Sequence, residues 1–500
     1  MMRYMVFTTD YDGTIANENR VPDDVIKSLA RLKASGRKLI LVTGRALEQL
    51  KDVFPEHTMF DLVVAENGAV IYDPSTLTTR LLADSPPEVL IDQLKLKNIP
   101  YSTGQVLVAT WEPHHIQVLE AIKESGVEYQ VIFNKGAVMV LPPGINKAIG
   151  LNAALRQLNM HEHNTVAMGD AENDNAMLQA CECAISVANA LPQVKAISDW
   201  TTKGSVGDGV RELISELIQN DLATMDERLS RHYLRIGEDL GGDPVSVSPY
   251  GSNILLAGSS SSGKTTLCGA FIEKLIYRQY QFCLIDPEGD YQGVQSLISI
   301  GDENQPPQVQ EILQVLTQAE ESVAVCLLAV PFDERPYFFR ELLHAILHLR
   351  EQTGHPHFLI IDEAHHLVPR DFERSFFNFP DDFTGFFAIT TQPGLICTDL
   401  LRRFNVVMTM GETPVATLES FACITKTKID IPPDLPKQKG TVLFWTNDNV
   451  QLRFILSDLP TRLLMRHKRK YATGDMGMNS FYFRGPGCKL CLKEIGRAHV

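Results

Sequence analysis

Two aspartates near the start of the chain, Asp10 and Asp12, directly follow the apolar run Tyr4–Thr9. Side chains alternate along a strand, so residues two apart face the same side. Two carboxylates that share a site can bind Mg²⁺ while one acts as nucleophile and the other as general acid/base, because like charges push their pKa values apart. The spacing therefore favours a catalytic carboxylate pair, and a simple strand-to-turn connection at Gly13 is the structural alternative.

Further polar residues follow other predicted strands. Thr43 comes after the apolar run 39–42 and offers a hydroxyl to a phosphate oxygen, while Lys147 offers a positive charge. Asp170 and Asp174 come after the apolar run 165–168, in a loop of the kind where a hard cation finds oxygen ligands. Together these residues indicate phosphate chemistry assisted by a divalent cation.

This set, in this order, resembles the four motifs of the haloacid dehalogenase superfamily of phosphohydrolases. The resemblance implies that Asp10 is a nucleophile that forms an aspartyl-phosphate, and that Asp12 is the general acid/base. It also implies that Thr43 and Lys147 hold the phosphoryl group. The implied Mg²⁺ ligands are Asp10, Asp12 through its backbone carbonyl, Asp170 and Asp174. An acid at position 12 favours a phosphatase over a phosphoryl-transfer ATPase, because water needs a base in the second half-reaction.

About a hundred residues separate Thr43 from Lys147, more than one strand–helix unit requires. The segments 66–69 and 138–144 resemble members of subfamily IIB, such as sucrose-phosphate and mannosyl-phosphoglycerate phosphatases. We therefore expect a small α+β cap over about residues 73–141, which excludes water and selects the substrate. The predicted substrate-binding residues are Thr43, Gly44, Arg45, Glu66, Asn67, Lys147 and Asn173.

A second strand–loop–helix pattern begins at Asn253–Ala257 and continues into Gly258-x-x-x-x-Gly263-Lys264-Thr265. This is the phosphate-binding loop, whose backbone amides cradle phosphates at a helix N-terminus. Lys264 is expected to reach the β and γ phosphates of ATP, and Thr265 to offer its hydroxyl to Mg²⁺. The predicted ATP-binding residues are Gly258, Ser259, Ser260, Ser261, Ser262, Gly263, Lys264, Thr265, Thr266 and Gln392.

The run Phe358–Ile361 predicts another buried strand, which ends in Asp362 and Glu363. We expect Asp362 to position Mg²⁺ and Glu363 to polarise the attacking water as a catalytic residue, which favours hydrolysis over kinase-type transfer. Gln392 follows a further apolar run and is predicted to sense the γ-phosphate. An ordinary residue at a strand end is the alternative for Gln392.

Roughly residues 245–459 resemble the HerA/FtsK branch of RecA-like ATPases. The similarity rests on the phosphate-binding loop, the Asp286–Gly289 segment, the Asp362–His365 stretch and Gln392. It implies ATP hydrolysis, homo-oligomeric rings and DNA as a partner. The formal net charge of −15 gives no global attraction to nucleic acid, which weakens the expectation of DNA binding.

Five hundred residues exceed one ordinary hydrophobic core, so we expect several domains. The predicted fold class is α/β, with a Rossmann-like haloacid dehalogenase core and α+β cap over 1–225 and a RecA-like ATPase domain over 226–486. Residues 487–500 are expected to be an aberrant tail, since their end resembles a translated sequencing adapter. No apolar run reaches the ~20 residues of a membrane span, no signal peptide opens the chain, and nine cysteines favour reduced thiols, so we expect a cytoplasmic protein without a membrane partner.

The sequence therefore predicts a Mg²⁺-dependent phosphatase for a small phosphorylated metabolite, with a sugar phosphate as the leading candidate, fused to an ATP-hydrolysing domain. Two alternatives stay open. One is a nucleic-acid end-processing phosphatase/kinase or DNA-associated ATPase. The other is an oligomeric nucleotide-binding scaffold whose first half senses a metabolite.

Overall fold

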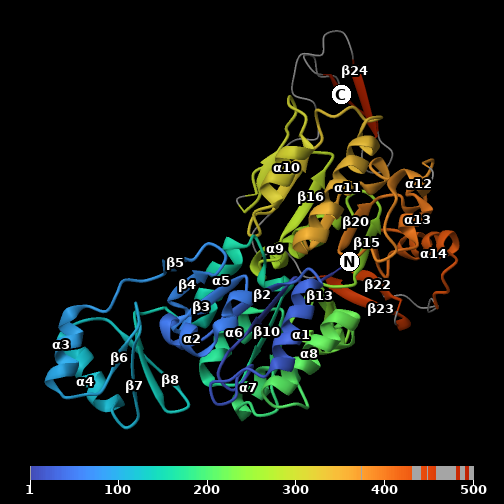
Figure 1. Ribbon diagram of the computed structural model, residues 1–500. Helices are drawn as coiled ribbons and strands as arrows, with labels where there is room; N and C mark the ends of the chain where they lie inside the picture. The colour runs from blue at the N-terminus through green and yellow to red at the C-terminus, as the bar shows by residue number, and fades with distance from the viewer. Residues whose placement is uncertain are drawn as a thin grey trace.

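Two large sheets organise the chain, and helices cover both faces of each (Figure 1). The computed structural model describes residues 2–294, 296–372, 374–430, 441–447, 449–457, 480–484 and 490–494. The first sheet is built from strands that precede residue 202, and the second from strands that follow residue 233. The basic residues 466–470 and Cys488 lie outside the described residues, as does most of the expected aberrant tail.

The first sheet has eight strands in the order β12-β11-β10-β1-β2-β3-β4-β5. The six strands from β12 to β3 run parallel, and β4 and β5 extend the sheet as an antiparallel hairpin. The central strands are buried along their whole length, which explains why the sequence shows them as continuous apolar runs. The strands are β1 (Val6–Thr9), β2 (Lys38–Val42), β3 (Leu62–Ala65), β4 (Val70–Asp73), β5 (Thr78–Leu81), β10 (Thr165–Gly169), β11 (Cys183–Ser186) and β12 (Trp200–Thr201). The helices are α1 (Asp23–Ala34), α2 (Leu47–Val53), α5 (Lys147–Gln157), α6 (Asn175–Ala180), α7 (Pro192–Ile197) and α8 (Gly207–Asn220).

A separate small layer, the cap, projects from this sheet (Figure 1). Its four strands lie in the order β6-β7-β9-β8, and two helices pack on them around their own apolar cluster, which includes Leu90, Val118 and Val140. The elements are α3 (Glu88–Leu96), β6 (Ser102–Thr103), β7 (Val108–Trp111), α4 (His115–Ser125), β8 (Gln130–Asn134) and β9 (Ala137–Leu141). The hairpin β4–β5 pairs with the first sheet, so residues 73–81 extend the core although the expected cap range included them.

The second sheet has eleven strands in the order β14-β13-β23-β22-β21-β15-β20-β19-β16-β18-β17. Strands β21 to β17 run parallel, and the other four are antiparallel. The strands are β13 (Leu234–Asp239), β14 (Pro244–Val247), β15 (Asn253–Gly258), β16 (Phe282–Asp286), β17 (Ile298–Ile300), β18 (Val323–Cys326), β19 (Phe358–Ile361), β20 (Phe386–Thr390), β21 (Val406–Met410), β22 (Thr441–Thr446) and β23 (Asn449–Ser457). The helices are α9 (Lys264–Tyr277), α10 (Val309–Leu316), α11 (Arg335–Thr353), α12 (Arg374–Phe377), α13 (Thr398–Leu401) and α14 (Pro414–Thr425), and a separate hairpin joins β24 (Ser480–Arg484) to β25 (Leu490–Glu494).

The two halves meet at the amino ends of their parallel strands. The 3₁₀ turn η3 (Glu162–Asn164) precedes β10, and it packs against the residues that precede β19. Across this contact His357 Nε2 lies 3.0 Å from Asn164 Oδ1, and the Tyr250 hydroxyl donates to the His163 backbone carbonyl at 2.7 Å. Because β10 and β19 both start at this interface, their carboxyl ends point away from it.

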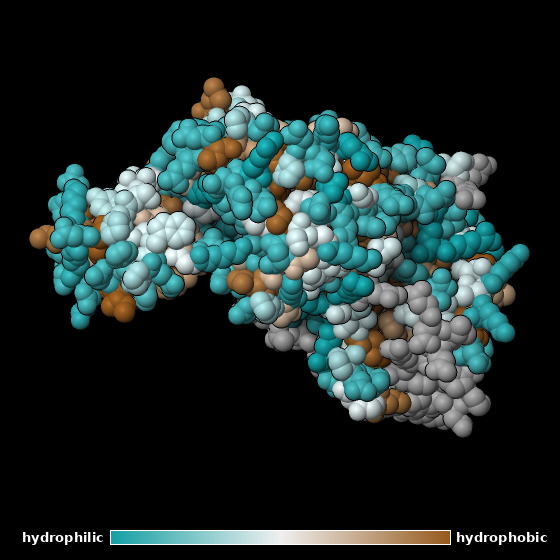
Figure 2. All heavy atoms as spheres, turned by 60° about the horizontal axis from the view of Figure 1, so that its bottom comes forward, coloured by the Kyte–Doolittle hydropathy of each residue, from teal (hydrophilic) through white to brown (hydrophobic). Residues whose placement is uncertain are grey.

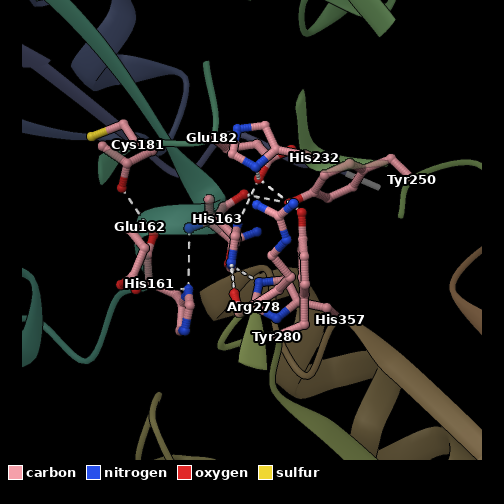
Figure 3. A network of polar contacts seen from close by, with 12 residues as sticks. His161, Glu162, His163, Cys181, Glu182, His232, Tyr250, Arg278, Tyr280 and His357 are labelled. Atoms are coloured by element: carbon pink, nitrogen blue, oxygen red, sulfur yellow. Dashed lines mark hydrogen bonds and ion pairs between the residues drawn. The ribbon is translucent and has the colours of Figure 1, made fainter. Parts of the chain in front are cut away.

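Histidines and tyrosines surround the buried acid Glu182 at the interface (Figure 3). His163 Nδ1 lies 2.5 Å from Glu182 Oε2, and His163 Nε2 lies 2.6 Å from the Arg278 backbone carbonyl. Burial alone would raise the pKa of Glu182, but the hydrogen bond from His163 and the nearby charges hold it at about 2. Glu182, His163 and His232 also have metal-ligand spacing. The neighbouring guanidinium of Arg3 supplies the positive charge in this network, which disfavours a metal ion there.

The surface is mainly hydrophilic on the face in Figure 2, where apolar side chains are scattered in small groups and the cap projects on the left. Among the described residues, no helix combines the length and the apolar character needed to cross a membrane.

Candidate active site

Three aspartates meet where the neighbouring parallel strands β1 and β10 end. Asp10 follows β1, Asp170 follows β10, and Asp174 closes the 3₁₀ turn η4 (Glu172–Asp174). All three are buried, and carboxylate oxygens of the three lie within 4.8 Å of one another. The parallel register of β1 and β10 brings the two strand ends to the same edge of the sheet. The carboxylates predicted from separate motifs therefore form one cluster.

Lys147 is the cation inside this cluster. It is the first residue of α5, and its fully buried Nζ lies 2.5 Å from Asp10 Oδ1 and 2.6 Å from Asp174 Oδ1. Burial alone would lower the pKa of Lys147, but the charges of Asp10 and Asp174 raise it above its ordinary value, so the ammonium stays charged. The other Asp174 oxygen accepts hydrogen bonds from the amides of Asp170 and Ala171 at 2.9 and 3.0 Å. Asp174 thereby holds Lys147 against Asp10.

The three acids of the cluster outnumber the two ammonium groups that contact them: Lys147 contacts Asp10 and Asp174, and Lys135 contacts Asp170. Burial raises the pKa of the Asp170 carboxyl, the ammonium of Lys135 opposes that rise, and the charge of Asp174 adds to it. A divalent cation would offset this excess of negative charge, and carboxylate oxygens are the ligands that Mg²⁺ prefers. The donor set therefore fits the predicted magnesium ion.

Asp12 and Arg45 lie on the open side of the site, where the Asp12 side chain is 43% exposed. Arg45 donates two hydrogen bonds to Asp12, from Nε to Oδ2 at 2.7 Å and from Nη2 to Oδ1 at 2.5 Å. Thr43 is buried behind them, and its hydroxyl oxygen accepts from the Arg45 amide at 3.1 Å. Gly44 lies against the cap, because a Cβ added there would come within 3.2 Å of Met139 Sδ. Arg45, predicted to bind substrate, thus binds Asp12 in this structure.

Glu66 links the core to the cap. It is buried, and its carboxylate accepts hydrogen bonds from three consecutive cap amides, those of Gln105 (2.9 Å), Val106 (2.8 Å) and Leu107 (2.9 Å). Both oxygens are occupied, so Glu66 links the core to the cap, and its predicted contact with substrate stays a prediction. The resemblance to subfamily IIB implies that Glu66 faces both the cap and the catalytic core, and the contact with the three cap amides agrees with this.

Asn67 and Asn173 connect two loops beside the acids. The Asn173 amide donates to Asn67 Oδ1 at 3.1 Å, and both residues are buried. Asn67 has a left-handed backbone with a φ of 54°, which asparagine tolerates better than most residues. The pair joins the loop after β3 to the loop after β10, so two predicted substrate-binding residues also brace the site.

A cavity of about 560 Å³ lies between the core and the cap. The core contributes Asp10, Asp12 and Arg45 to its wall, and the cap contributes Trp111 and Lys135, among others. Lys135 also forms an ion pair with the buried Asp170. Sequence reasoning did not single out Lys135, and its only local signal is the Lys-Gly pair of a tight hairpin turn.

Comparisons with known proteins agree with this geometry for the first half of the chain. The family model of haloacid dehalogenase-like hydrolases matches residues 7–110 and 95–214. The N-terminal half is a haloacid dehalogenase-like domain. The matched residues include β1 and β10, and the family match ends before the second sheet begins.

The region of this chain that matches its relatives covers nearly the full length of each relative. Phosphoglycolate phosphatase 2 of Saccharolobus solfataricus is 25% identical over 223 residues, which are 43% of this chain and 94% of that protein. Phosphoglycolate phosphatase of Methanothermobacter thermautotrophicus is 29% identical over 219 residues, 41% of this chain and 95% of that protein. A solved haloacid dehalogenase-like hydrolase from Bacteroides thetaiotaomicron is 19% identical, covers 43% of this chain and 99% of its own, and has a TM-score of 0.38.

The second half carries its own candidate site, far along the chain from the haloacid dehalogenase-like domain. Strand β15 ends at Gly258 and α9 begins at Lys264, so the predicted phosphate-binding loop connects them. Ser261 and Gly263 have left-handed backbones, with φ values of 63° and 105°. Lys264 Nζ donates to the carbonyls of Gly258 and Ser259 at 2.9 and 3.0 Å. The lysine therefore folds back over its own loop.

Two acids face this loop across a cavity of about 190 Å³. Asp362 is buried, and Glu363 has a left-handed backbone with a φ of 42°, a strained conformation for glutamate. The cavity is lined by Ser260, Ser261, Gly263, Lys264, Thr265, Thr266, Asp362 and Glu363. Strand β20 lies between β15 and β19, and Gln392 follows it but lies outside this lining. The structure thus brings the loop and the acids together around this cavity, and the predicted role of Gln392 stays a prediction.

The Asp286–Gly289 segment forms a turn closed by a side chain. The Asp286 carboxylate accepts from the amides of Gly289 and Tyr291, each at 2.8 Å, directly after β16. This carboxylate is engaged with its own loop, and that explains the pattern without a role in nucleotide binding.

Proposed function

We propose that the N-terminal half hydrolyses a small phosphorylated metabolite through an aspartyl-phosphate on Asp10. The observation that carries this proposal is the buried contact of Lys147 Nζ with both Asp10 and Asp174, 2.5 and 2.6 Å away, where β1 and β10 end. Burial raises the pKa of Asp10 well above its ordinary value, and the ammonium of Lys147 opposes that rise, so the lysine favours the ionised carboxylate that would attack phosphorus. The family match over residues 7–214 supports the same chemistry.

In the first step, an Asp10 oxygen attacks phosphorus and Asp12 gives a proton to the departing alkoxide oxygen. In the second step, Asp12 takes a proton from water, and that water attacks the phosphorus of the aspartyl-phosphate. Lys147 and the hydroxyl of Thr43 hold the phosphoryl oxygens, and Arg45 keeps the Asp12 carboxylate in place. The cap keeps bulk water away from the cavity.

Mg²⁺ fits beside these residues, held by Asp10, Asp170, Asp174 and the Asp12 backbone carbonyl. When bound, it neutralises charge on the transferred phosphoryl group. The dependence of activity on Mg²⁺ is part of the proposal, and so is the division of the chain into residues 1–225 and 226–486.

The substrate class is a small phosphate ester that fits the cavity of about 560 Å³ between core and cap. The relatives named as phosphoglycolate phosphatases favour a short phosphorylated acid, and the resemblance to subfamily IIB favours a sugar phosphate. Both belong in the first substrate panel.

The test is phosphate release by the full chain with Mg²⁺ and without ATP. The panel contains 2-phosphoglycolate, phosphoglycerates, sugar phosphates, nucleotides and 3′-phosphorylated DNA. Asp10→Asn is expected to lower kcat by about 10³-fold or more, because the nucleophile is lost. Asp23→Asn, at an exposed position at the start of α1, is the matched control. Release that survives in Asp10→Asn would overturn the proposal.

A second candidate function belongs to the other half, which we propose binds and hydrolyses ATP. The observation that favours it is that Asp362 and Glu363 line one cavity with the phosphate-binding loop, and that Glu363 is held in a strained backbone conformation there. The proposed roles are Mg²⁺ positioning for Thr265 and Asp362 and water activation for Glu363. Ring assembly and DNA binding are proposals from the HerA/FtsK resemblance alone. Release of phosphate from ATP that Glu363→Gln leaves unchanged would contradict the water-activating role.

A further inference from the structure

Lys135 reaches the catalytic acids from the tip of the cap. It lies in the two-residue turn between β8 and β9, where Asn134 pairs with Ala137. Its ammonium contacts the fully buried carboxylate of Asp170, and a Cβ added at Gly13 would come within 2.8 Å of Lys135 Nζ. The cap therefore delivers a positive charge to the loop that carries Asp10 and Asp12.

The backbone at this tip is unfavourable for lysine. Lys135 has a φ of 48° and Gly136 a φ of 86°, so both residues of the turn are left-handed. Such hairpin turns favour Asn, Asp or Gly at the first position, because Cβ crowds the following carbonyl oxygen in a left-handed backbone, which Gly avoids and the short polar side chains of Asn and Asp offset by local hydrogen bonds. A lysine held in this conformation, with its side chain aimed at the acids, indicates a functional reason for its presence.

Lys135 is also the more exposed of the two cations in the cavity wall. The charged groups in the cavity wall are Asp10, Asp12, Arg45 and Lys135. Arg45 is committed to Asp12 by two hydrogen bonds, and Lys147 is enclosed behind the wall between Asp10 and Asp174. The Lys135 side chain, in contrast, is 44% exposed at its contact with Asp170. It is therefore the cation best placed to meet a substrate from the cap side.

We propose that Lys135 is a specificity-determining residue that binds a second anionic group of the substrate, such as a carboxylate a few bonds from the phosphate. This inference rests on the proposed phosphatase function and specifies the substrate class of the same site. Asp10 and Lys135 line the same cavity, so a substrate with its phosphoryl group at Asp10 could place a carboxylate a few bonds away beside Lys135.

The test compares 2-phosphoglycolate with ethyl phosphate, which has the same length but lacks the carboxylate. Lys135→Asn removes the charge and keeps a residue that suits the turn, so the cap is expected to fold. Lys135→Arg restores a cation. Lys123→Asn, at an exposed position near the end of α4, is the matched control on the same cap.

In steady-state assays, Lys135→Asn is expected to lower kcat/KM for 2-phosphoglycolate by about tenfold or more, mainly through KM, and to change ethyl phosphate hydrolysis by less than about threefold. Lys135→Arg should recover most of the loss. Equal losses for the two esters would overturn the proposal, because they would mean that Lys135 acts on the phosphoryl group or on cap folding.

Calorimetric binding of the same two esters separates this proposal from the proposed function. Wild-type chain should bind 2-phosphoglycolate more tightly than ethyl phosphate, and Lys135→Asn should remove the difference. A preference that Lys135→Asn abolishes, with no phosphate release from any ester, would refute the phosphatase activity and support Lys135 as the anion-binding residue. Phosphate release without any such preference would refute the role of Lys135 alone.

Discussion

The ring of His163 stacks on the ring of Tyr280, with centroids 3.7 Å apart and planes 11° from parallel. The two residues belong to different halves of the chain, and both bind the same carboxylate oxygen of Glu182, from His163 Nδ1 at 2.5 Å and the Tyr280 hydroxyl at 3.0 Å (Figure 3). The buried Glu182 thus forms hydrogen bonds with residues of both halves of the chain. Since both candidate sites lie at the opposite ends of their strands, this contact fixes the halves to each other without involving either site.

Mild acid is expected to weaken the molecule through this interface. Burial lowers the pKa of His232 and of His355 to about 4, and it places the pKa values of His161 and His357 well below 6.5. Below pH 6.5 the unfolded chain gains protons on these histidines that the folded chain does not bind. Stability is therefore complete above about pH 6.5 and falls as the pH drops toward 4, by up to ~1.4 kcal/mol per pH unit for each histidine.

Chemical unfolding at pH 7.5 and pH 5 measures this loss. Replacing the partly exposed cap residue His114 with glutamine should leave the pH dependence unchanged, because that residue lies outside the interface. A free energy of unfolding that stays constant between the two pH values would contradict the expected role of the buried histidines.

Loss of the Lys147 charge is expected to destabilise the first half strongly. Lys147→Met leaves Asp10 and Asp174 buried and uncompensated, which typically costs about 3–5 kcal/mol. The measurement is the thermal midpoint of the full chain in chelator. Arg156→Met, on the same helix α5, removes an exposed ion pair with Glu320 and should cost less than about 1 kcal/mol. Similar decreases in the thermal midpoint for both variants would show that the buried contacts of Lys147 stabilise the protein no more than the exposed ion pair of Arg156 does.

Glu66→Gln is expected to loosen the cap. The glutamine amide cannot accept all three hydrogen bonds from residues 105–107, so about 1–3 kcal/mol of cap attachment is lost. Limited proteolysis should cut the 97–107 segment faster than in wild type. Glu56→Gln, an exposed change in the same half, provides the comparison. An unchanged cleavage rate would mean that the cap is held by other contacts.

The residues at strand ends were predictable because each follows a short apolar run, and parallel strands end at one edge of the sheet. This logic correctly brought together Asp10 with Asp170, and the phosphate-binding loop with Asp362. The predicted helix after that loop also formed, and α9 begins at Lys264 itself. The local sequence pattern is sufficient to predict a site residue where that residue directly follows a strand.

Some contacts between the cap and the core, and those between the two halves of the chain, could not be predicted from the sequence. Lys135 finds its partner Asp170 across the gap between cap and core, and a tight turn carries no information about the surface opposite it. The contacts of the interface histidines could not be predicted from the sequence either, because His163 and His357 meet their partners only when the two halves pack together. Such residues depend on tertiary packing, which spacing along the chain does not encode.

The two activities are expected to fail independently. Lys264→Ala removes the ammonium that we propose contacts the phosphates of ATP, and it should lower ATP affinity by about tenfold or more. The phosphate-binding loop lies at the carboxyl end of β15, whereas the halves touch at the amino ends of their strands, so phosphate release by the first half should change by less than about twofold. Calorimetric titration with ATP and the phosphatase assay, run on one preparation, measure both. Lys428→Ala, at an exposed position after α14, is the control. A parallel fall in both activities would mean that nucleotide binding is coupled to the first site through the histidine interface.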